Sequence, residues 1–363
     1  MQTSVDVVVF IVGAALVFAS LGSAVRTVVL PRGIPAKIAT TVFLVVRVLF
    51  RVRLFRASSY ERRDRVMAMY APLSLLLLAL VWLVIVGAGY TAMFWALGGR
   101  PLRAAFELSG SSMFTLGFIH PVDLPKVVLA FTEAAIGLTL AALLITYLPS
   151  LYGAFSRREA GVAHLEVRAG SPPWGPVIIE RFGRISWLGG LSGLWDRWED
   201  WFVELGETHT SFPALAFFRS PVPEHSWVTA AGAILDAASL ASSTMEDHDP
   251  DAELLIRAGY ISLRRVADFF GVPYDPDPQP GDPITIAREE FDDAYDRLAA
   301  AGVRLKPDRD QAWRDFAGWR VNYDAVLVTL AALVMAPYAQ WSSDRSITRF
   351  RPRVLGRRGV RPR

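Results

Sequence analysis

The sequence predicts an all-α membrane protein with three transmembrane helices, a re-entrant segment and a predominantly α-helical cytosolic domain. Of its 363 residues, 52% are hydrophobic, and the apolar excess lies mainly before residue 150. Charged residues make up 20% of the chain and become frequent after that point. Alternating strand patterns are few. A membrane half therefore precedes a soluble, helical half.

Composition also excludes several kinds of chemistry. The sequence contains no cysteine, which removes disulfides, thiolate nucleophiles and cysteine-ligated zinc. It contains no phosphate-binding glycine-rich loop, no serine nucleophile elbow and no histidine pair at metal-ligand spacing. We therefore expect no enzyme, no cofactor and no resident metal.

The first transmembrane helix is expected over residues 1–25. Its uncharged run extends from Val7 to Val25, and no positive charge precedes it as a secretory leader would require. Basic residues follow it, and such residues favour the cytosolic side. This predicts a multi-pass protein of the cell membrane with its N-terminus outside and its C-terminal domain in the cytosol.

Residues 26–70 form a basic segment that is expected to be cytosolic or interfacial. The run from Ile34 to Phe55 is apolar, but cations interrupt it, and a charge in mid-bilayer is costly. The run either lies along the membrane surface or spans the membrane. The first alternative keeps the basic residues on one side and makes anionic lipid headgroups a partner. The cations in and beside the run are Lys37, Arg47, Arg51, Arg53 and Arg56.

Two further spans are expected over residues 72–97 and 127–148. The first lies in a stretch, 66–99, without any charged residue, and the second contains a single charge, Glu133. Each run is long enough to cross a hydrocarbon core of about 30 Å. The chain therefore crosses the membrane three times before the cytosolic domain begins.

The segment between these two spans, from Pro101 to Pro121, is too apolar for a simple loop and too short to cross and return as a helix. A hairpin that enters half of the membrane fits it, with a short helix over residues 101–114 and Pro101 in the first turn. Irregular backbone at membrane depth is tolerated where it is buried in protein or lines water. Residues 115–118 are therefore expected to line a pore.

Thr115, Leu116, Gly117 and Phe118 follow this short helix. An outer helix, a pore helix, Thr-Leu-Gly-Phe and an inner helix together resemble the pore module of the potassium-channel superfamily, whose filter reads Thr-x-Gly-Tyr/Phe-Gly. The resemblance covers about residues 70–150, so we assign the pore module to 71–152. It implies that the threonine hydroxyl and successive carbonyls replace the hydration shell of a permeant cation. It also implies a homotetramer, because one chain supplies one filter strand.

The expected outer mouth departs from the family pattern at two residues. Ile119 stands where the family has its second filter glycine, and His120 where an acidic residue usually follows. Because a β-branched residue resists a left-handed backbone, we expect a pore for K⁺ with weakened selectivity against Na⁺. His120 could make conduction sensitive to pH. The alternative interpretation of this four-residue motif is an ordinary turn.

Several residues around the filter have expected supporting roles. Gly137 resembles the gating hinge of the family's inner helix, with close helix packing as the alternative. Glu133 is expected to share or neutralise its charge behind the filter, in a structural ion pair rather than an ion-coordinating ring. Its candidate neighbours are Arg103, Glu107 and Lys126.

The remaining chain is divided into a linker over 153–190, a helical regulatory domain over 191–345 and a basic tail over 346–363. Asp-Pro pairs predict helices over 250–270 and 283–301, and glycines near their ends predict where they stop. The apolar run from Val326 to Met335 is too short to span and is expected to be a core helix. An aromatic stripe at helical spacing is expected inside the domain. Its members are Trp195, Trp198, Trp201 and Phe202.

Several polar residues of this domain could form a pocket for an unidentified cytosolic ligand, although capping and packing explain such residues as well. They are His209, Arg219, Glu224, His225 and Asp236. No aromatic-interleaved basic groove accompanies the tail, so nucleic acid is not an expected partner.

These features predict a tetrameric pore-loop cation channel that its cytosolic domain gates or modulates. The alternative is a membrane-anchored sensor or scaffold with a non-conducting, pore-like segment. A third possibility, a hydrolase or transferase in the cytosolic domain, needs an acid–base pocket that the sequence does not display.

Overall fold

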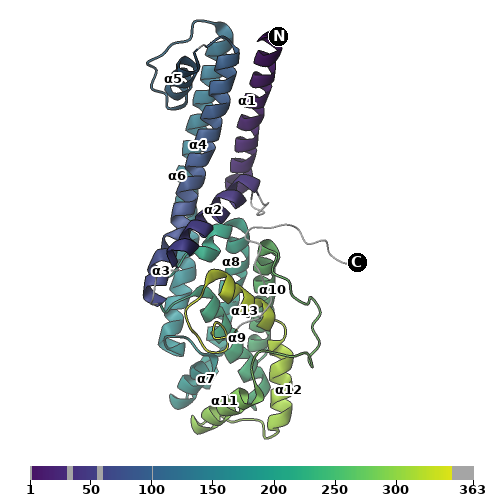
Figure 1. The fold of residues 1–363 in the computed structure, drawn as a ribbon. Helices are drawn as coiled ribbons and strands as arrows, with labels where there is room; N and C mark the ends of the chain where they lie inside the picture. Colours follow the sequence, from purple (N-terminus) through teal and green to yellow (C-terminus); the bar gives the residue numbers. More distant parts are fainter. Residues whose placement is uncertain (1, 31–35, 55–59, 100, 346–363) are drawn as a thin grey trace. The chain divides into compact units, whose positions relative to one another are not determined.

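The computed structural model describes residues 2–30, 36–54, 60–99 and 101–345 (Figure 1). These residues form helices and no strand, which confirms the all-α prediction for the described part of the chain. The expected basic tail, 346–363, lies outside the described residues. So do Ile34, Phe55 and Arg56 of the ambiguous apolar run.

The chain folds as two compact units. The apolar-helix unit comprises Met1–Phe50 and Tyr70–Tyr152, and the C-terminal unit comprises Arg51–Met69 and Gly153–Arg363. Helix α6, Leu124–Ala169, contributes residues to both units. Residues 51–54 and 60–69, at the end of the expected basic segment 26–70, group with the C-terminal unit.

Three helical segments are long and apolar enough to cross a membrane. They are α1 (Gln2–Ala24) with the π-helical turn η1 (Val25–Val29), α4 (Tyr70–Ala96) and α6. These correspond to the three spans that hydropathy predicts. The last one continues as helix well beyond residue 148 and contains Pro149.

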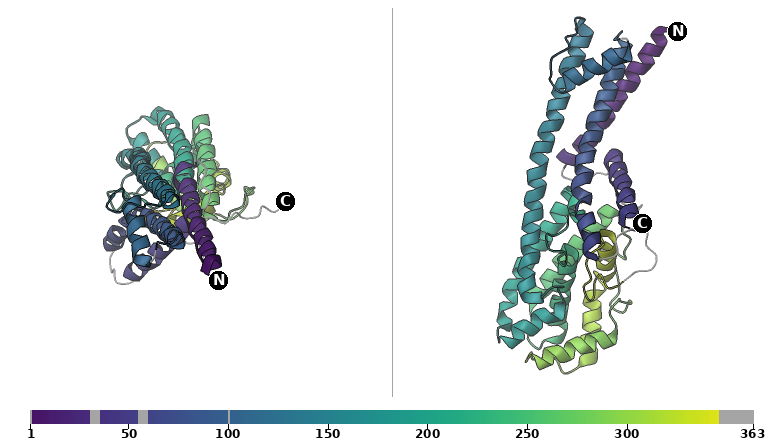
Figure 2. Two further views of the ribbon diagram at one scale, coloured as in Figure 1. Left: turned by 90° about the horizontal axis from the view of Figure 1, so that it is seen from above. Right: turned by 60° about the vertical axis from the view of Figure 1, so that its left-hand side comes forward.

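Helix α1 packs closely along α4, and Figure 2 shows the purple α1 beside the blue α4 in its right-hand view. A Cβ atom added to Gly13 would lie 2.5 Å from the backbone oxygen of Gly89, so the two backbones touch where both residues are small. Two hydrogen bonds link the helices further along. Ser20 Oγ donates to the Trp82 carbonyl (3.2 Å), and Trp82 Nε1 donates to Ser23 Oγ (3.1 Å).

Helix α2 (Lys37–Leu54) is not among the helices long and apolar enough to span, because charged residues interrupt it. One face is buried in the apolar-helix unit, where the Phe43 ring meets the Tyr70 ring edge-on at 6.0 Å and the Tyr70 hydroxyl donates to the Phe43 carbonyl. The opposite side exposes an apolar ridge that includes Val48, Leu49 and Val52. This division is typical of an amphipathic surface helix.

The C-terminal unit is built around α9 (Trp227–Thr244), of which nearly every residue is buried. Helices α7, α10, α12 and α13 pack against α9, and α8 packs against α10. The predicted aromatic stripe lies on α8, and Trp195, Trp198 and Phe202 are fully buried as expected. The bounds are Tyr60–Ala68 (α3), Gly175–Arg184 (α7), Leu188–Gly190 (η2), Ser192–Ser211 (α8), Pro213–Phe217 (η3), Pro250–Phe270 (α10), Arg288–Ala300 (α11), Arg309–Arg320 (α12) and Asp324–Val334 (α13).

Two of the predicted helix boundaries can be compared directly. Helix α10 has the predicted bounds and ends at Gly271, which is left-handed at φ +65°. Helix α11 begins at Arg288 instead of residue 283, so the prediction from Asp282 and the following proline is wrong. The reason is that Asp282 Oδ2 accepts the Gln279 amide in the preceding loop, whereas the Glu290 side chain caps the start of α11.

A buried charge network joins α9, α12 and α13. Arg320 is fully buried and donates to Asp236 Oδ1, to Asp324 Oδ1 (2.7 Å) and to the Trp341 carbonyl (2.6 Å). Two carboxylates thus share a single guanidinium, and burial raises the pKa of Asp236 to about 6, against the influence of Arg320. Removing one member of such a network leaves an uncompensated buried charge, which costs about 3–5 kcal/mol.

Candidate functional site

Helix α5 (Leu102–Met113) lies between α4 and α6 in the chain and packs against α4 near one end of the long helices (Figure 1). One side chain ties it to both neighbours. The Ser109 hydroxyl lies 3.1 Å from the Gly87 carbonyl oxygen of α4 and 2.5 Å from Glu133 Oε1 of α6. Ser109 is buried, so these contacts fix the position of α5 between the two helices.

Glu133 is completely buried, and its partner differs from the expected ion pair. Arg103 pairs with Glu107 on the exposed side of α5 at 2.7 Å, and Lys126 pairs with Asp123 at 2.7 Å. The hydroxyl of Ser109 therefore takes the place that these cations were expected to occupy. Glu133 Oε2 has no hydrogen-bond partner among the described residues.

The loop after α5 turns its amide groups back toward the helix. Four of them donate to Ser111 or Ser112, in the last turn of α5. The donors are Thr115, Leu116, Gly117 and Ile119, at 3.0, 2.9, 3.4 and 3.3 Å. Within the described part of the chain, no donor reaches the carbonyl oxygens of residues 115–118. The loop therefore presents backbone acceptors, and four of its amide donors are occupied.

The backbone angles of this loop explain the need for glycine at one position. Gly117 has φ +71°, in the left-handed region that glycine adopts without strain. Thr115 also has a positive φ, +53°, although it is β-branched, and its Oγ1 donates to the Phe114 carbonyl at 2.7 Å. Ile119, a residue of the expected outer mouth, does not have a positive φ. His120, the other residue of the expected outer mouth, is exposed.

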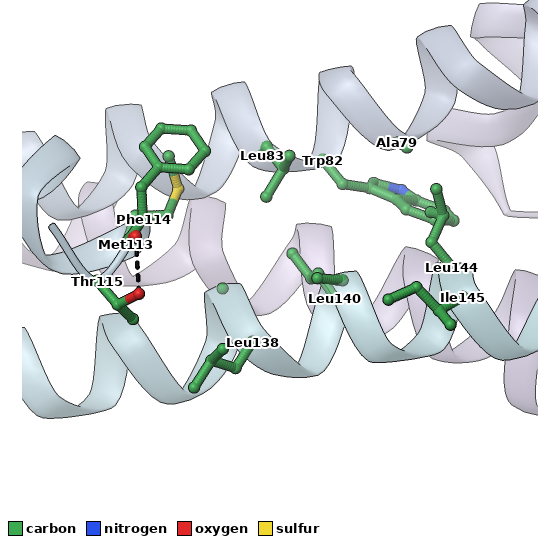
Figure 3. A pocket seen from close by; sticks show the side chains of 12 residues that line it. Ala79, Trp82, Leu83, Met113, Phe114, Thr115, Leu138, Leu140, Leu144 and Ile145 are labelled. Carbon is green, nitrogen blue, oxygen red and sulfur yellow. Dashed lines mark hydrogen bonds between the residues drawn. The ribbon is translucent and has the colours of Figure 1, made fainter.

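An apolar cavity of about 410 Å³ lies next to the start of this loop, between α4 and α6 (Figure 3). Met113, Phe114 and Thr115 form one end of it, and Trp82 and Leu144 lie toward the other. Its polar side-chain atoms are already bonded, because Trp82 Nε1 donates to Ser23 and Thr115 Oγ1 donates to Phe114. The cavity therefore offers mainly carbon atoms to an occupant.

Gly137 lies where α6 touches the end of α5. A Cβ atom at this position would lie 2.3 Å from the Met113 backbone oxygen, closer than real contacts allow. Close packing of α6 on the end of α5 therefore explains why a small residue stands at position 137. This is the alternative to a gating hinge. The hinge stays a prediction.

The polar residues of the C-terminal unit do not form one pocket. Asp236 belongs to the Arg320 network. His209 is fully buried, and its Nε2 lies 3.3 Å from the Arg158 guanidinium. Burial and, after it, this guanidinium hold the pKa of His209 well below its usual range. Arg219 and His225 lie in a third place, the loop before α9. No group of three metal-binding side chains occurs in the described residues.

Sequence reasoning missed two features of these sites. The Ser109–Glu133 contact has a sequence signal, because a lone carboxylate in a span requires a polar neighbour and α5 carries several serines. The packing of α3 within the C-terminal unit has no such signal, since Arg219, the partner of Asp64, lies 155 residues from it in the sequence.

Comparison with known proteins identifies no relative. No protein-family model, no curated protein and no solved structure matches the chain.

We predict that Gly137→Ala destabilises the protein and that Gly110→Ala does not. The added methyl group at residue 137 meets the Met113 carbonyl, and overpacking of this kind costs about 1–3 kcal/mol. A Cβ at Gly110, in α5 itself, has nothing within 4 Å. Thermal unfolding of the purified proteins in detergent measures the difference. Equal melting temperatures for both variants would show that α5 and α6 are not in contact at Gly137.

Proposed function

We propose that this chain forms a tetrameric pore-loop cation channel in the cell membrane, similar to potassium channels but with weakened selectivity. The observation that carries the proposal is the set of carbonyl oxygens at residues 115–118. They follow a short helix between two helices long enough to span a membrane, and no described donor satisfies them.

A loop with unpaired carbonyl groups is unfavourable in the hydrocarbon core of a membrane unless protein, water or ions satisfy those groups. An unsatisfied backbone group in the bilayer core costs several kcal/mol, so irregular backbone there is buried in protein or lines water. Carbonyl oxygens that line water can take over the hydration shell of a monovalent cation. The C-terminal end of α5, which carries the negative end of the helix dipole, precedes the loop and favours positive charge nearby.

The side chains of the loop favour assembly with further copies. Phe114, Leu116 and Phe118 are each more than half exposed in the single chain, at 56%, 62% and 63%. Adjacent exposed apolar side chains at such a site mark a surface that another protein or lipid covers. Four copies around an axis would cover them and bring four sets of carbonyls together. A closed, non-conducting assembly would instead support the sensor or scaffold alternative.

We further propose that the C-terminal unit is cytosolic and modulates the pore, and that the N-terminus lies outside. Basic residues are concentrated after α1 and before α4, and such residues favour the cytosolic side. Helix α2, with its apolar ridge and its cations Lys37 and Arg51, suits a membrane surface that contains anionic lipid. No enzymatic activity, cofactor or nucleic-acid partner is proposed.

Gly117→Ala should strongly reduce conduction without preventing assembly. The position has room for a methyl group, so the cost comes from a left-handed backbone, about 1–2 kcal/mol for a residue with a side chain. We expect cation flux into liposomes to fall by about tenfold or more, as this energy implies, and the oligomer mass to stay that of wild type. Gly110→Ala serves as the control. Undiminished flux through the Gly117 variant would remove residues 115–118 from the conduction path.

Selectivity for K⁺ over Na⁺ should be weak in the wild type and should increase in Ile119→Gly. Ile119 does not supply the left-handed backbone that the family's second filter glycine allows, so the outermost carbonyl site is incomplete. Reversal potentials under K⁺ and Na⁺ gradients measure this directly. Strict K⁺ selectivity of the wild type would show that the filter does not need that glycine.

Tags at residue 1 and near residue 60 should be accessible from opposite sides of the membrane. The prediction follows from one crossing by α1 and none by α2. Protease protection of the two tags in sealed vesicles tests it. Access to both tags from one side would mean that α2 crosses as well.

A further inference from the structure

The loop Phe218–His225, between η3 and α9, contacts two helices that are distant from each other in the sequence. One is α3, which ends one residue before α4 begins. The other is the second part of α6, from Gly153 onward. By chain connectivity, both helices continue into the spans on either side of α5. All the contacts described below lie within the C-terminal unit.

Arg219 makes the contact to α3. Its guanidinium donates to Asp64 Oδ1 at 2.5 Å and to the Tyr60 hydroxyl at 3.3 Å. The same guanidinium donates to the carbonyls of Val334 and Met335, both at 2.8 Å, at the end of α13. The side chains of Arg219 and Asp64 are 11% and 10% exposed, so this pair is shielded from water, unlike an ordinary surface salt bridge.

Arg158 makes the main contact to α6. It is buried, and it donates to the carbonyl of Phe218 (2.8 Å), at the start of the loop, and to the carbonyl of Leu215 (2.7 Å) in η3, just before it. At the other end of the loop, His225 Nε2 lies 3.3 Å from Glu166 Oε2 of α6. The start of the loop is therefore bonded to α6 through Arg158, His225 lies beside Glu166 of α6 at the other end, and Arg219 bonds to α3.

We propose that the Phe218–His225 loop couples the C-terminal unit to the pore by holding α3 and α6 together. A movement of this loop would act on the helices that lead to both spans beside the candidate filter. The inference rests on the proposed function and deepens it, because it names the contacts through which regulation would pass. A ligand could use this connection only by binding differently to the open and closed states.

The test compares full-length variants in lipid nanodiscs and liposomes. Asp64→Asn, Arg219→Gln and the double variant remove the charge pair, and Asp64→Glu keeps it. Arg265→Gln is the matched control, because its pair with Glu207 is exposed, at 53% and 70%. Hydrogen exchange over residues 60–68 reports whether the Arg219 contact stabilises α3. Single-channel open probability reports whether that contact affects gating.

We expect the neutral variants to exchange roughly tenfold faster over 60–68, as the loss of a tertiary contact permits. Their open probability should change severalfold in the same direction. The double variant should also exchange faster than wild type, whereas Asp64→Glu and Arg265→Gln should resemble wild type.

Three results would overturn the inference in different ways. Unchanged exchange over 60–68 would show that Arg219 does not hold α3, whatever the pore does. Faster exchange with unchanged open probability would make the contact purely structural and leave the channel proposal intact. A wild type that does not conduct would overturn the proposed function, and the coupling with it.

Discussion

The constraint on which this structure depends is that every backbone polar group at membrane depth needs a partner. Helices α1, α4 and α6 meet it internally. In the proposed pore the loop after α5 would also lie at membrane depth, where Ser111 and Ser112 accept four of its amides while the carbonyls of residues 115–118 have no described donor. In that setting water, cations or other copies of the chain would supply the missing partners. The proposed tetrameric pore supplies all three.

The other contacts of the apolar-helix unit hold this loop in place. Ser109 lies between the Gly87 carbonyl and Glu133, and Gly137 allows α6 to touch the end of α5. Trp82 lines the cavity beside Thr115 and is itself bonded to α1 through Ser20 and Ser23. Helix α1 is therefore bonded to α4, the helix that forms one wall of this cavity.

Hydropathy predicts the spans, because the cost of burying charge in hydrocarbon is large and local in sequence. Local signals also predict α10, its glycine end and the burial of the α8 stripe. They fail at α11, where Asp282 could cap a helix or close a loop and the fold uses it for the loop. They also miss Asp64–Arg219 and the partner of Glu133, since contacts between distant residues depend on the tertiary fold.

For the candidate site, too, local sequence signals single out some residues but not the residues that contact them. The sequence singles out residues 115–118 by a resemblance that stays a prediction, and the structure gives Gly117 a positive φ, which glycine adopts without strain. Which groups surround it cannot be predicted, because several serines and charges near α5 are equivalent in the sequence. The fold distinguishes them by placing Ser109 on the buried side of α5 and Arg103 on the exposed side.

The most direct test of the central claim is an experimental structure of the assembled protein in lipid, determined with K⁺ present. The proposal predicts four chains around one axis, with the carbonyl oxygens of residues 115–118 turned toward it and ion density between them. A single chain, or an assembly whose axis is closed by side chains while these carbonyls bond to protein, would contradict it.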